Sequence, residues 1–592
     1  MMNNKPPFQD IINSYFQASE SWLGAFQKPT QSTIFKSQVE DWSALAHSVT
    51  NNPTTVLEQQ MNWWNQQINL FNDCILGAGS PNAPEKDPRF KDESWASNPL
   101  YHYIKESYKL VCESVQKTID DTDDLDPDAK ERLEFFSRQF LNAMSPSNFV
   151  TTNPEIMKLT LESNGSNLIK GLEQLQEDMT RSVDMLNIRM TDAEAFTLGE
   201  NIAATPGKVV FKNHMFELIQ YQPTTEKVYK RPLMIVPPFV NKYYIMDLSE
   251  KRSFVKWLVD QGHTVFMVSW INPDESYSES DFGTYVTDGL IPALDAIESV
   301  TGEREVNGLG YCIGGTLLTA TMAYMAGKKR KQRIKSATLL TTILDFKQPG
   351  ELGIFINDAM ISAIESQNSM RGYMDGRQMA VSFSLLRENS LYWNYYVTNY
   401  LKGEKPVAFD LLHWNCDNTN VPAACHNQML RQFYLENKLS QPNAIEIDGV
   451  GIDLSKVKSS IYFLSAIEDH IALWKGTYKG TELLGGQSTF VLAESGHIAG
   501  PMNHANSTKY GFWTNPNVKT DADTWLEKAK KNTGSWWPHW QEWLDERNFS
   551  EKLEPRTLVG ELDAPGSYVK QRIEDVLANS ADAQSEENKN VA

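Results

Sequence analysis

A cysteine stands where an apolar strand is predicted to turn into a helix. The run Gly310-Tyr311-Cys312-Ile313-Gly314-Gly315 follows an apolar segment and precedes a predicted helix from Thr316 to about Ala326. Small residues on both sides of the cysteine are needed because Cβ atoms would collide in so tight a turn, which lifts the cysteine side chain above the sheet. The N-terminus of the helix beneath it favours a thiolate. We predict that Cys312 is a nucleophile; the alternative is a glycine-rich turn that holds a cysteine incidentally.

An acid and a histidine follow this turn in the order that hydrolytic triads use. Asp469 comes just after the apolar segment 459–466, and His497 follows the next predicted strand, 488–492. The order of nucleophile, acid and histidine is that of the α/β-hydrolases. His497 is the predicted base and Asp469 the predicted acid; otherwise they are an ordinary histidine and a surface turn residue. His470 adjoins the acid and would point away from it, so we predict a supporting or structural role.

An oxyanion formed at this site needs two backbone donors. One is predicted to be the N–H of Ile313, the residue after the nucleophile. The second should come from the loop after the early strand 232–236, where Pro237 and Pro238 have no N–H to offer. Phe239 is therefore the better candidate, with Val240 next.

The elements that must position these residues begin near residue 200. Short apolar or β-branched segments alternate there with helical stretches, which indicates a parallel sheet covered on both faces. The predicted strands are 232–236, 264–270, 305–309, 336–344, 459–466 and 488–492. The interval between the fourth and fifth strands is too long for a simple connection and too aromatic for a solvated loop, so an inserted cap is predicted at about 345–458. The catalytic domain would cover 201–578, followed by a disordered polar tail at 579–592.

Residues 1–200 are predicted to form an all-α domain. Apolar residues recur at helical spacing in two segments, and Asp126 followed by Pro127 is typical of a helix start. These apolar faces either pack on one another or rest on an apolar partner. The residues of the two segments are Phe8, Ile11, Ile12, Tyr15, Phe16, Trp22, Leu23 and Phe26, and then Met61, Trp63, Trp64, Ile68 and Phe71.

Composition excludes several classes of protein. With 55 basic and 75 acidic residues the net charge is −20, which argues against a nucleic-acid-binding function. The five cysteines are scattered, and the spacing of His413 and His426 from Cys416 and Cys425 is not that of a zinc site, so we expect neither a disulfide framework nor a metal. Without a signal peptide or an apolar run of about 18 residues, the chain is expected to be cytoplasmic and not to span a membrane.

The sequence resembles the class I poly(3-hydroxyalkanoate) synthases over nearly its whole length. The motifs that carry the resemblance are SPSNFVTTNPEIMKLTLESNG from Ser145, PLMIVPPFVNKYYIMDL from Pro232, GYCIGGT from Gly310, LDFKQPGELGIF from Leu344, FDLLHWNCDNTN from Phe409, EDHIALW from Glu468, ESGHIAG from Glu494 and GSWWPHW from Gly534. The resemblance implies an α/β-hydrolase fold with an inserted cap, preceded by the all-α domain. It also implies an acyltransferase with Cys312 as nucleophile, His497 as base and Asp469 as the supporting acid.

Further properties follow from the resemblance alone. The implied substrate is (R)-3-hydroxyacyl-CoA, chiefly 3-hydroxybutyryl-CoA, and coenzyme A belongs to the substrate, so no separate cofactor is expected. The implied partners are the growing polyester chain, the storage-granule surface and a second copy in a homodimer. The N-terminal domain would serve dimer or granule association and would meet granule-associated proteins.

Three questions stay open at the level of sequence. Either His497 or Asp469 would deprotonate the hydroxyl that attacks the acyl-enzyme. A thioesterase or polyester hydrolase on the same fold is the second functional hypothesis, to be separated by its soluble product. A granule coat protein without activity is the third, and the complete Cys-Asp-His set argues against it.

Overall fold

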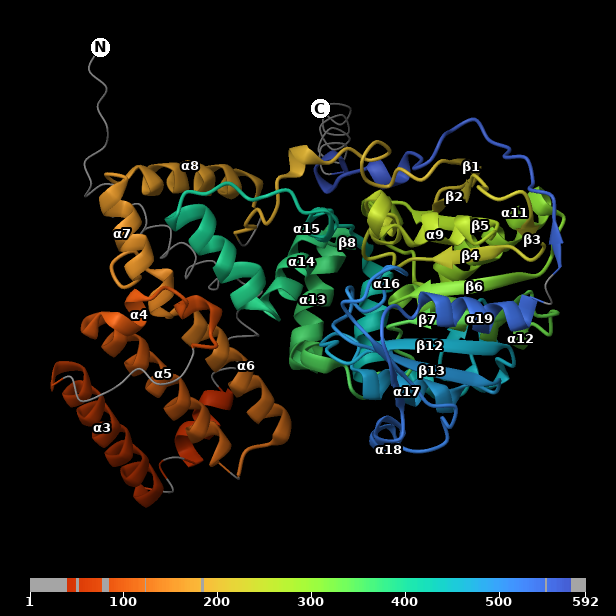
Figure 1. The fold of residues 1–592 in the computed structure, drawn as a ribbon. Helices are drawn as coiled ribbons and strands as arrows, with labels where there is room; N and C mark the ends of the chain where they lie inside the picture. Colours follow the sequence, from red (N-terminus) through yellow and green to blue (C-terminus); the bar gives the residue numbers. More distant parts are fainter. Residues whose placement is uncertain are drawn as a thin grey trace, which may run out of the picture. The chain divides into compact units, whose positions relative to one another are not determined.

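The computed structural model describes residues 40–48, 50, 53–76, 85–122, 124–182, 186–548 and 551–576. The predicted apolar segment from Phe8 to Phe26 and the predicted tail at 579–592 lie outside these residues. The chain divides into two compact units, which are described separately (Figure 1). The first consists of Met1–Asp192 and Gln378–Val407, and the second of Ala193–Arg377 and Ala408–Ala592.

The first unit is helical, as predicted for this part of the chain. Its N-terminal helices are α3 (Pro53–Leu76), α4 (Ser94–Ser97), α5 (Pro99–Asp120), α6 (Pro127–Ala143), α7 (Pro154–Glu162) and α8 (Ser166–Arg181). The predicted start of α6 is confirmed. The Asp126 side chain accepts a hydrogen bond from the N–H of Ala129, and Pro127 occupies the first helical position, where no N–H is needed.

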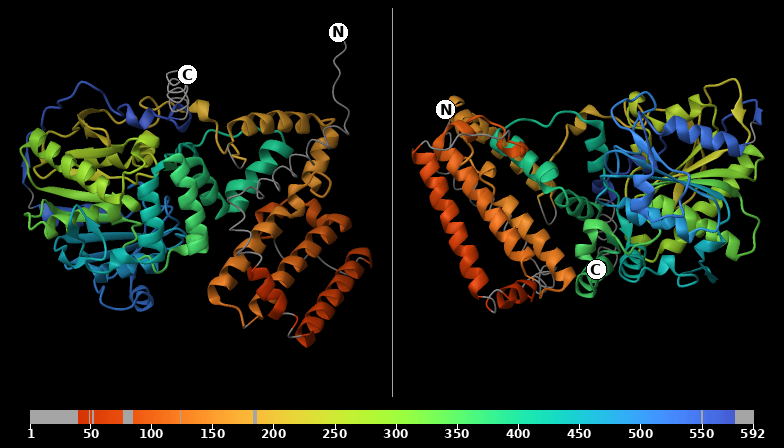
Figure 2. Two further views of the ribbon diagram at one scale, coloured as in Figure 1. Left: turned by 180° about the vertical axis from the view of Figure 1, so that it is seen from behind. Right: turned by 60° about the horizontal axis from the view of Figure 1, so that its bottom comes forward.

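Residues 378–407 belong to this helical unit, although the sequence placed them in a cap over the sheet. They comprise most of α14 (Gly376–Leu385) together with η9 (Asn389–Trp393) and η10 (Tyr396–Leu401), and lie among the α6–α8 helices in Figures 1 and 2. Tyr392, Trp393 and Tyr400 pack in one core cluster with Leu175 of α8. The Tyr400 hydroxyl also donates to the fully buried carboxylate of Asp178, 2.7 Å away. The aromatic content of this insertion is thus buried in the helical unit.

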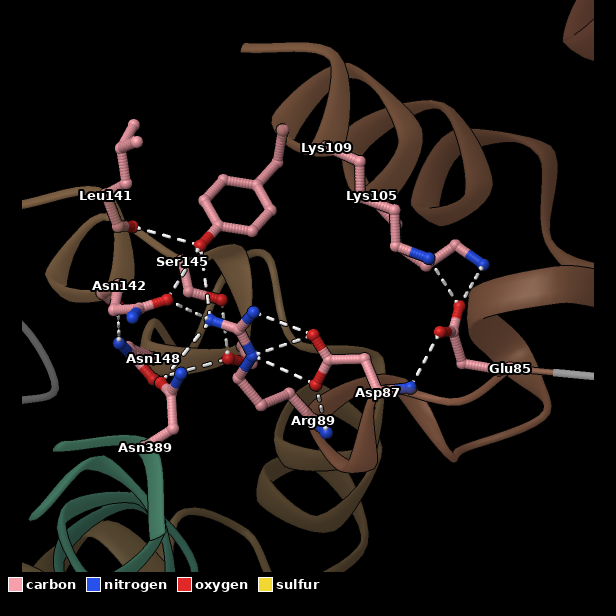
Figure 3. Close-up of polar contacts among 12 residues, drawn as sticks. Glu85, Asp87, Arg89, Lys105, Lys109, Leu141, Asn142, Ser145, Asn148 and Asn389 are labelled. Atoms are coloured by element: carbon pink, nitrogen blue, oxygen red, sulfur yellow. Dashed lines mark hydrogen bonds and ion pairs between the residues drawn. The ribbon is translucent and has the colours of Figure 1, made fainter. Parts of the chain in front are cut away.

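A half-buried arginine, Arg89, joins this insertion to the N-terminal helices. Figure 3 shows the guanidinium of Arg89 paired with Asp87 at 2.7 Å and donating to Asn142 of α6 at 2.8 Å. The same Nη1 reaches the side-chain oxygen of Asn389 at 3.5 Å, and the Asn142 amide donates to the buried carboxylate of Glu388 at 2.6 Å. These charge-assisted bonds hold α6 and the insertion together.

The second unit is built on one mixed sheet of ten strands in the order β1-β2-β5-β4-β6-β7-β12-β13-β14-β15. The six central strands, β5 to β13 in that order, are parallel, which confirms the predicted core of the sheet. The strands are β1 (Gly207–Lys212), β2 (Phe216–Tyr221), β4 (Leu233–Val236), β5 (Val265–Trp270), β6 (Val306–Tyr311), β7 (Ile334–Leu340), β12 (Ser460–Ala466), β13 (Ser488–Ala493), β14 (Phe512–Thr514) and β15 (Lys530–Asn532).

The expectation of a wholly parallel sheet is therefore wrong at both edges. β2 runs antiparallel to β5, and β14 antiparallel to β13. β1 and β2 follow one another through a short connection, which permits only antiparallel pairing. β7 also ends at Leu340, earlier than predicted, because the chain turns at Thr341, where φ is +43°.

Helices cover both faces of this sheet (Figure 2). Helix α12 is buried along almost its whole length, and α19 contributes three buried tryptophans to the large core cluster of the unit. The main helices are α9 (Phe254–Asp260), α11 (Ile291–Thr301), α12 (Ile313–Gly327), α13 (Asp358–Arg371), α15 (Asp410–Cys416), α16 (Ala423–Gln428), α17 (Trp474–Leu483), α18 (Ala522–Glu527) and α19 (Trp537–Asn548). Apolar runs such as that of α12 are typical of helices with no face in solvent.

The C-terminal segment 551–576 crosses the β1–β2 edge of the sheet and is anchored there by a buried carboxylate. Glu217 of β2 accepts hydrogen bonds from the N–H groups of Ser567 and Tyr568 at 2.8 and 3.0 Å, and from Lys212 at 3.0 Å. A side chain at Gly566 would collide with this carboxylate. Burial raises the pKa of Glu217, but the hydrogen bonds from Ser567, Tyr568 and Lys212 outweigh it and leave the pKa lowered.

Candidate active site

The predicted strand, turn and helix are present at Cys312. The residue joins β6 to α12 with φ +53° and ψ −128°, a conformation that is strained for any residue with a side chain. The glycines around it are required, because a Cβ at Gly310 would collide with Gly315 and a Cβ at Gly314 with the carbonyl oxygen of Val236. The tight turn therefore exposes the thiol at the carboxyl end of the parallel strands.

The three residues predicted from sequence order lie together. The Cys312 side chain is hydrogen-bonded to His497, whose Nδ1 lies 2.7 Å from Oδ2 of Asp469. The other carboxylate oxygen of Asp469 accepts the N–H groups of Ile471 and Ala472, each at 2.9 Å. The Asp469 side chain is fully buried and that of His497 is 10% exposed, so the carboxylate is fixed from both sides and can orient the imidazole.

The environment of His497 favours its protonated form. Burial lowers the pKa of His497, but the Asp469 carboxylate and Cys312, which both hydrogen-bond to the ring, raise it well above its ordinary value. A histidine paired with a thiol is the arrangement by which enzymes activate a cysteine nucleophile. The arrangement is suited to attack on an acyl group.

The oxyanion loop, residues 237–241, passes over the first turn of α12. This follows from Gly314, whose missing side chain leaves room for the carbonyl oxygens of Val236 and Pro237. Phe239 is buried, and its ring stacks on that of Tyr285 with centroids 4.3 Å apart. The loop therefore lies against the turn that holds Cys312; that Ile313 and Phe239 act as oxyanion donors stays a prediction.

His470 does not share the environment of its neighbour. Its side chain is half-buried, and its carbonyl oxygen faces Gly350 so closely that a Cβ there would lie 2.6 Å away. The segment after Asp469 thus contacts the backbone near residue 350, which fits a structural role for His470.

Two tyrosines near the site were not predicted. The Tyr311 hydroxyl donates to the carbonyl oxygen of His497 at 3.2 Å, and the rings of the two residues lie 5.6 Å apart. Tyr434 interacts electrostatically with Cys312, and burial together with this interaction raises the pKa of Tyr434. Tyr434 comes from the long interval between strands, where no local pattern distinguishes it from other aromatic residues.

The described part of the chain has no cluster of three or more histidine, cysteine or acidic residues that could hold a metal ion. His426 instead pairs with Asn368 at 3.1 Å, and the His413 ring packs on Phe196 with centroids 4.9 Å apart. None of the helices in the described ranges is both long and apolar enough to cross a bilayer.

Comparison with known proteins identifies both parts of the chain. Residues 86–258 match the family described as the N-terminus of poly-beta-hydroxybutyrate polymerase (PhaC), and residues 241–501 match the alpha/beta hydrolase fold. A poly(3-hydroxyalkanoate) polymerase subunit PhaC of Rhizobium meliloti (strain 1021) is 42% identical over 94% of this chain and 93% of the relative. The subunit PhaC of Cupriavidus necator is 38% identical over 85% of this chain and 86% of the relative.

Among solved structures, a monoacylglycerol lipase from Paleococcus ferrophilus covers 48% of this chain and 88% of its own, with 10% identity and a TM-score of 0.30. The assignment to a family rests on the curated relatives, which align with this chain over most of its length. The chain therefore belongs to the poly(3-hydroxyalkanoate) polymerases, and it is an acyltransferase with an α/β-hydrolase fold.

Proposed function

We propose that the chain polymerises (R)-3-hydroxyacyl groups, chiefly 3-hydroxybutyryl, from their coenzyme A thioesters through an acyl intermediate on Cys312. The observation that carries this proposal is the hydrogen-bonded series Cys312, His497 and Asp469 at a strained strand-to-helix turn. The membership of the chain in the polymerase family supports the same chemistry.

In the first half-reaction, His497 holds the proton of Cys312 and the thiolate attacks the thioester carbonyl. The N–H groups of Ile313 and Phe239 stabilise the oxyanion that forms. When the C–S bond to coenzyme A breaks, His497 gives its proton to the departing thiolate. One thioester replaces another, so the acyl group stays activated for the next transfer.

In the second half-reaction, the 3-hydroxyl of another monomer or of the growing chain attacks the acyl group on Cys312. The ester forms, the Cys312 thiolate leaves, and the hydroxyl proton goes to a base. We propose His497 for this role, because both carboxylate oxygens of Asp469 already accept hydrogen bonds and its side chain is fully buried. An incoming hydroxyl has no access to Asp469.

The surroundings of the thiol favour polymerisation over hydrolysis. Cys312, Ile498 and Met502 all pack against the large core cluster, and the half-buried Tyr434 interacts electrostatically with Cys312. An apolar surrounding lowers the local concentration of water, which would otherwise release the acyl group as free acid. Coenzyme A enters as part of the substrate, and the proposed steps need no other cofactor.

The test is turnover of 3-hydroxybutyryl-CoA, followed by loss of thioester absorbance and by turbidity. Cys312→Ala should abolish both signals, whereas Cys416→Ala, a change at an exposed cysteine, should leave both unchanged. Residual turnover in Cys312→Ala above about a hundredth of the original rate would exclude the acyl-cysteine route. Thioester loss with soluble 3-hydroxybutyrate and no turbidity would identify a hydrolase instead.

We also propose that the helical unit meets the polyester granule in the cytoplasm through α3. One face of this helix exposes Leu57, Met61, Trp64, Ile68 and Phe71, each at least half exposed. These side chains recur at helical spacing, and the only charged residues of the helix are Glu58 and Asp73. A neutral, apolar face fits the surface of an uncharged polyester, and granule-associated proteins or a second copy in a homodimer would compete for it.

Sedimentation with purified polymer granules tests this surface. Trp64→Asp should weaken binding, whereas Glu58→Gln should not; unchanged binding of Trp64→Asp would refute the assignment. Light scattering of the same variants measures the proposed homodimer. Granule binding with no activity to lose in the original protein would instead identify a coat protein.

A further inference from the structure

Lys242 is buried in the chain segment that leaves the oxyanion loop, three residues after Phe239. Its side chain is 4% exposed, and its ammonium donates to the carbonyl oxygen of Gln571 at 2.5 Å. Burial lowers the pKa of Lys242, and the carboxylates of Asp417 and Asp575 offset part of that effect. A buried ammonium is costly, and an apolar side chain of similar length would avoid the cost.

The oxyanion loop lacks the usual means of holding its backbone. Pro237 and Pro238 have no N–H, so this part of the chain cannot pair as a strand on that side. Side chains fix it instead. The Trp270 indole donates to the carbonyl oxygen of Pro237 at 3.0 Å, and the Phe239 ring stacks on Tyr285. The next anchor along the chain is Lys242.

Lys242 is held from two further directions. The Trp414 indole of α15 donates to its carbonyl oxygen at 2.7 Å, and its neighbour Asn241 pairs with Asn418 through the backbone. Its ammonium reaches the C-terminal segment, where Gln571 directly follows η14 (Tyr568–Lys570). The same segment is hydrogen-bonded to Glu217 at the edge of the sheet. It therefore connects the sheet edge to the residue that follows the oxyanion loop.

We propose that Lys242 is a positioning residue for catalysis: its bond to the Gln571 carbonyl holds the oxyanion loop where the Phe239 N–H can stabilise the oxyanion. The inference rests on the proposed function, because the oxyanion forms only if Cys312 attacks a thioester. Without the ammonium the loop loses this hydrogen bond to the C-terminal segment. Displacing a donor by about an ångström costs on the order of 10²-fold in rate.

The experiment compares Lys242→Met with Lys242→Arg in the full chain, with Lys230→Met as the matched control. Lys230 is a surface lysine that pairs with Glu551. Three quantities are measured: kcat and KM for 3-hydroxybutyryl-CoA, the rate of Cys312 alkylation by iodoacetamide, and inhibition by a trifluoromethyl ketone analogue of the substrate. Alkylation forms no oxyanion, whereas addition of the thiolate to the ketone forms one.

For Lys242→Met we expect kcat to fall about 10- to 100-fold and the inhibitor to weaken by a similar factor. KM and the alkylation rate should stay within about twofold of the original values. Lys242→Arg should recover most of kcat because it keeps a buried cation and donor, and Lys230→Met should behave as the original protein. If Lys242→Met does not fold, Lys242→Leu, which likewise has neither a charge nor a donor, replaces it in the same comparison.

Two results would overturn the inference. One is a kcat for the neutral variant equal to that of the original protein; the other is an alkylation rate that falls as much as kcat, which would mean a general disruption of the site. Failure of the proposed function gives a different pattern, since the original protein would then release no coenzyme A, or Cys312→Ala would release it equally fast.

Discussion

Replacement of Asp469 by asparagine separates the orienting role of this residue from its bulk. Oδ1 of Asp469 accepts two backbone N–H groups, from Ile471 and Ala472. In Asp469→Asn the amide oxygen must occupy that position, so the NH₂ group faces Nδ1 of His497. The imidazole is then held with its proton on the nitrogen that faces Cys312, which cannot accept the thiol proton.

The expected fall in kcat combines two losses, the hydrogen bond to the carboxylate and the correct tautomer of His497. A hydrogen bond from imidazolium to carboxylate contributes about 2 kcal/mol, which is about 30-fold in rate. The wrong tautomer of His497 lowers the rate further. From the two effects together, we expect kcat to fall about 10³-fold with little change in KM. Loss of the Asp469 charge also removes a cause of the raised pKa of His497, so Cys312 alkylation at neutral pH should slow.

The assay is thioester loss from 3-hydroxybutyryl-CoA together with alkylation by iodoacetamide across pH. His470→Gln is the control, because it alters the adjacent residue, and its kcat should stay within about threefold of the original. If Asp469→Asn keeps more than about a tenth of the original kcat, the orienting role assigned to Asp469 is wrong.

Three further changes test the fold that supports the site. Gly314→Ala places a Cβ against the Val236 carbonyl oxygen and should lower kcat by at least about 10²-fold, measured as thioester loss in protein that still unfolds cooperatively. Glu217→Gln should destabilise the protein by about 2–3 kcal/mol at neutral pH, measured by denaturant unfolding. Because the pKa of Glu217 is lowered in the fold, its contribution is present above the ordinary glutamate pKa and lost as the pH falls through the lowered value, so the two proteins should converge in acid. Tyr400→Phe removes the bond to Asp178 and should cost about 1–2 kcal/mol, seen as faster amide hydrogen exchange in α8 but not in the central sheet.

The parts of the fold that follow from local physics could be predicted from the sequence. The turn at Cys312 needs glycines wherever backbone approaches backbone, and the glycines stand at those positions. The start of α6 is set by the Asp126 side chain and by Pro127. The central strands are apolar on both faces, which marks them as parallel and covered. Sequence order alone was enough to select Asp469 and His497.

The parts of the fold that depend on contacts between distant segments could not be predicted from the sequence. β14 and β15 are three residues each and gain their strand conformation only by pairing at the edge of the sheet. The aromatic residues of 378–407 indicated burial, but nothing local distinguishes burial over the sheet from burial beside α8.

The candidate active site combines residues that the sequence predicts with contacts that only the fold creates. The residue types, spacing and order of the sequence were enough to select Cys312, Asp469 and His497 as candidates, because backbone strain and strand topology constrain them locally. Only the tertiary structure created the electrostatic interaction between Tyr434 and Cys312 and the hydrogen bond from Lys242 to the carbonyl oxygen of Gln571. A contact between segments more than a hundred residues apart is decided by the packing of the whole unit, and no pattern within either segment encodes it.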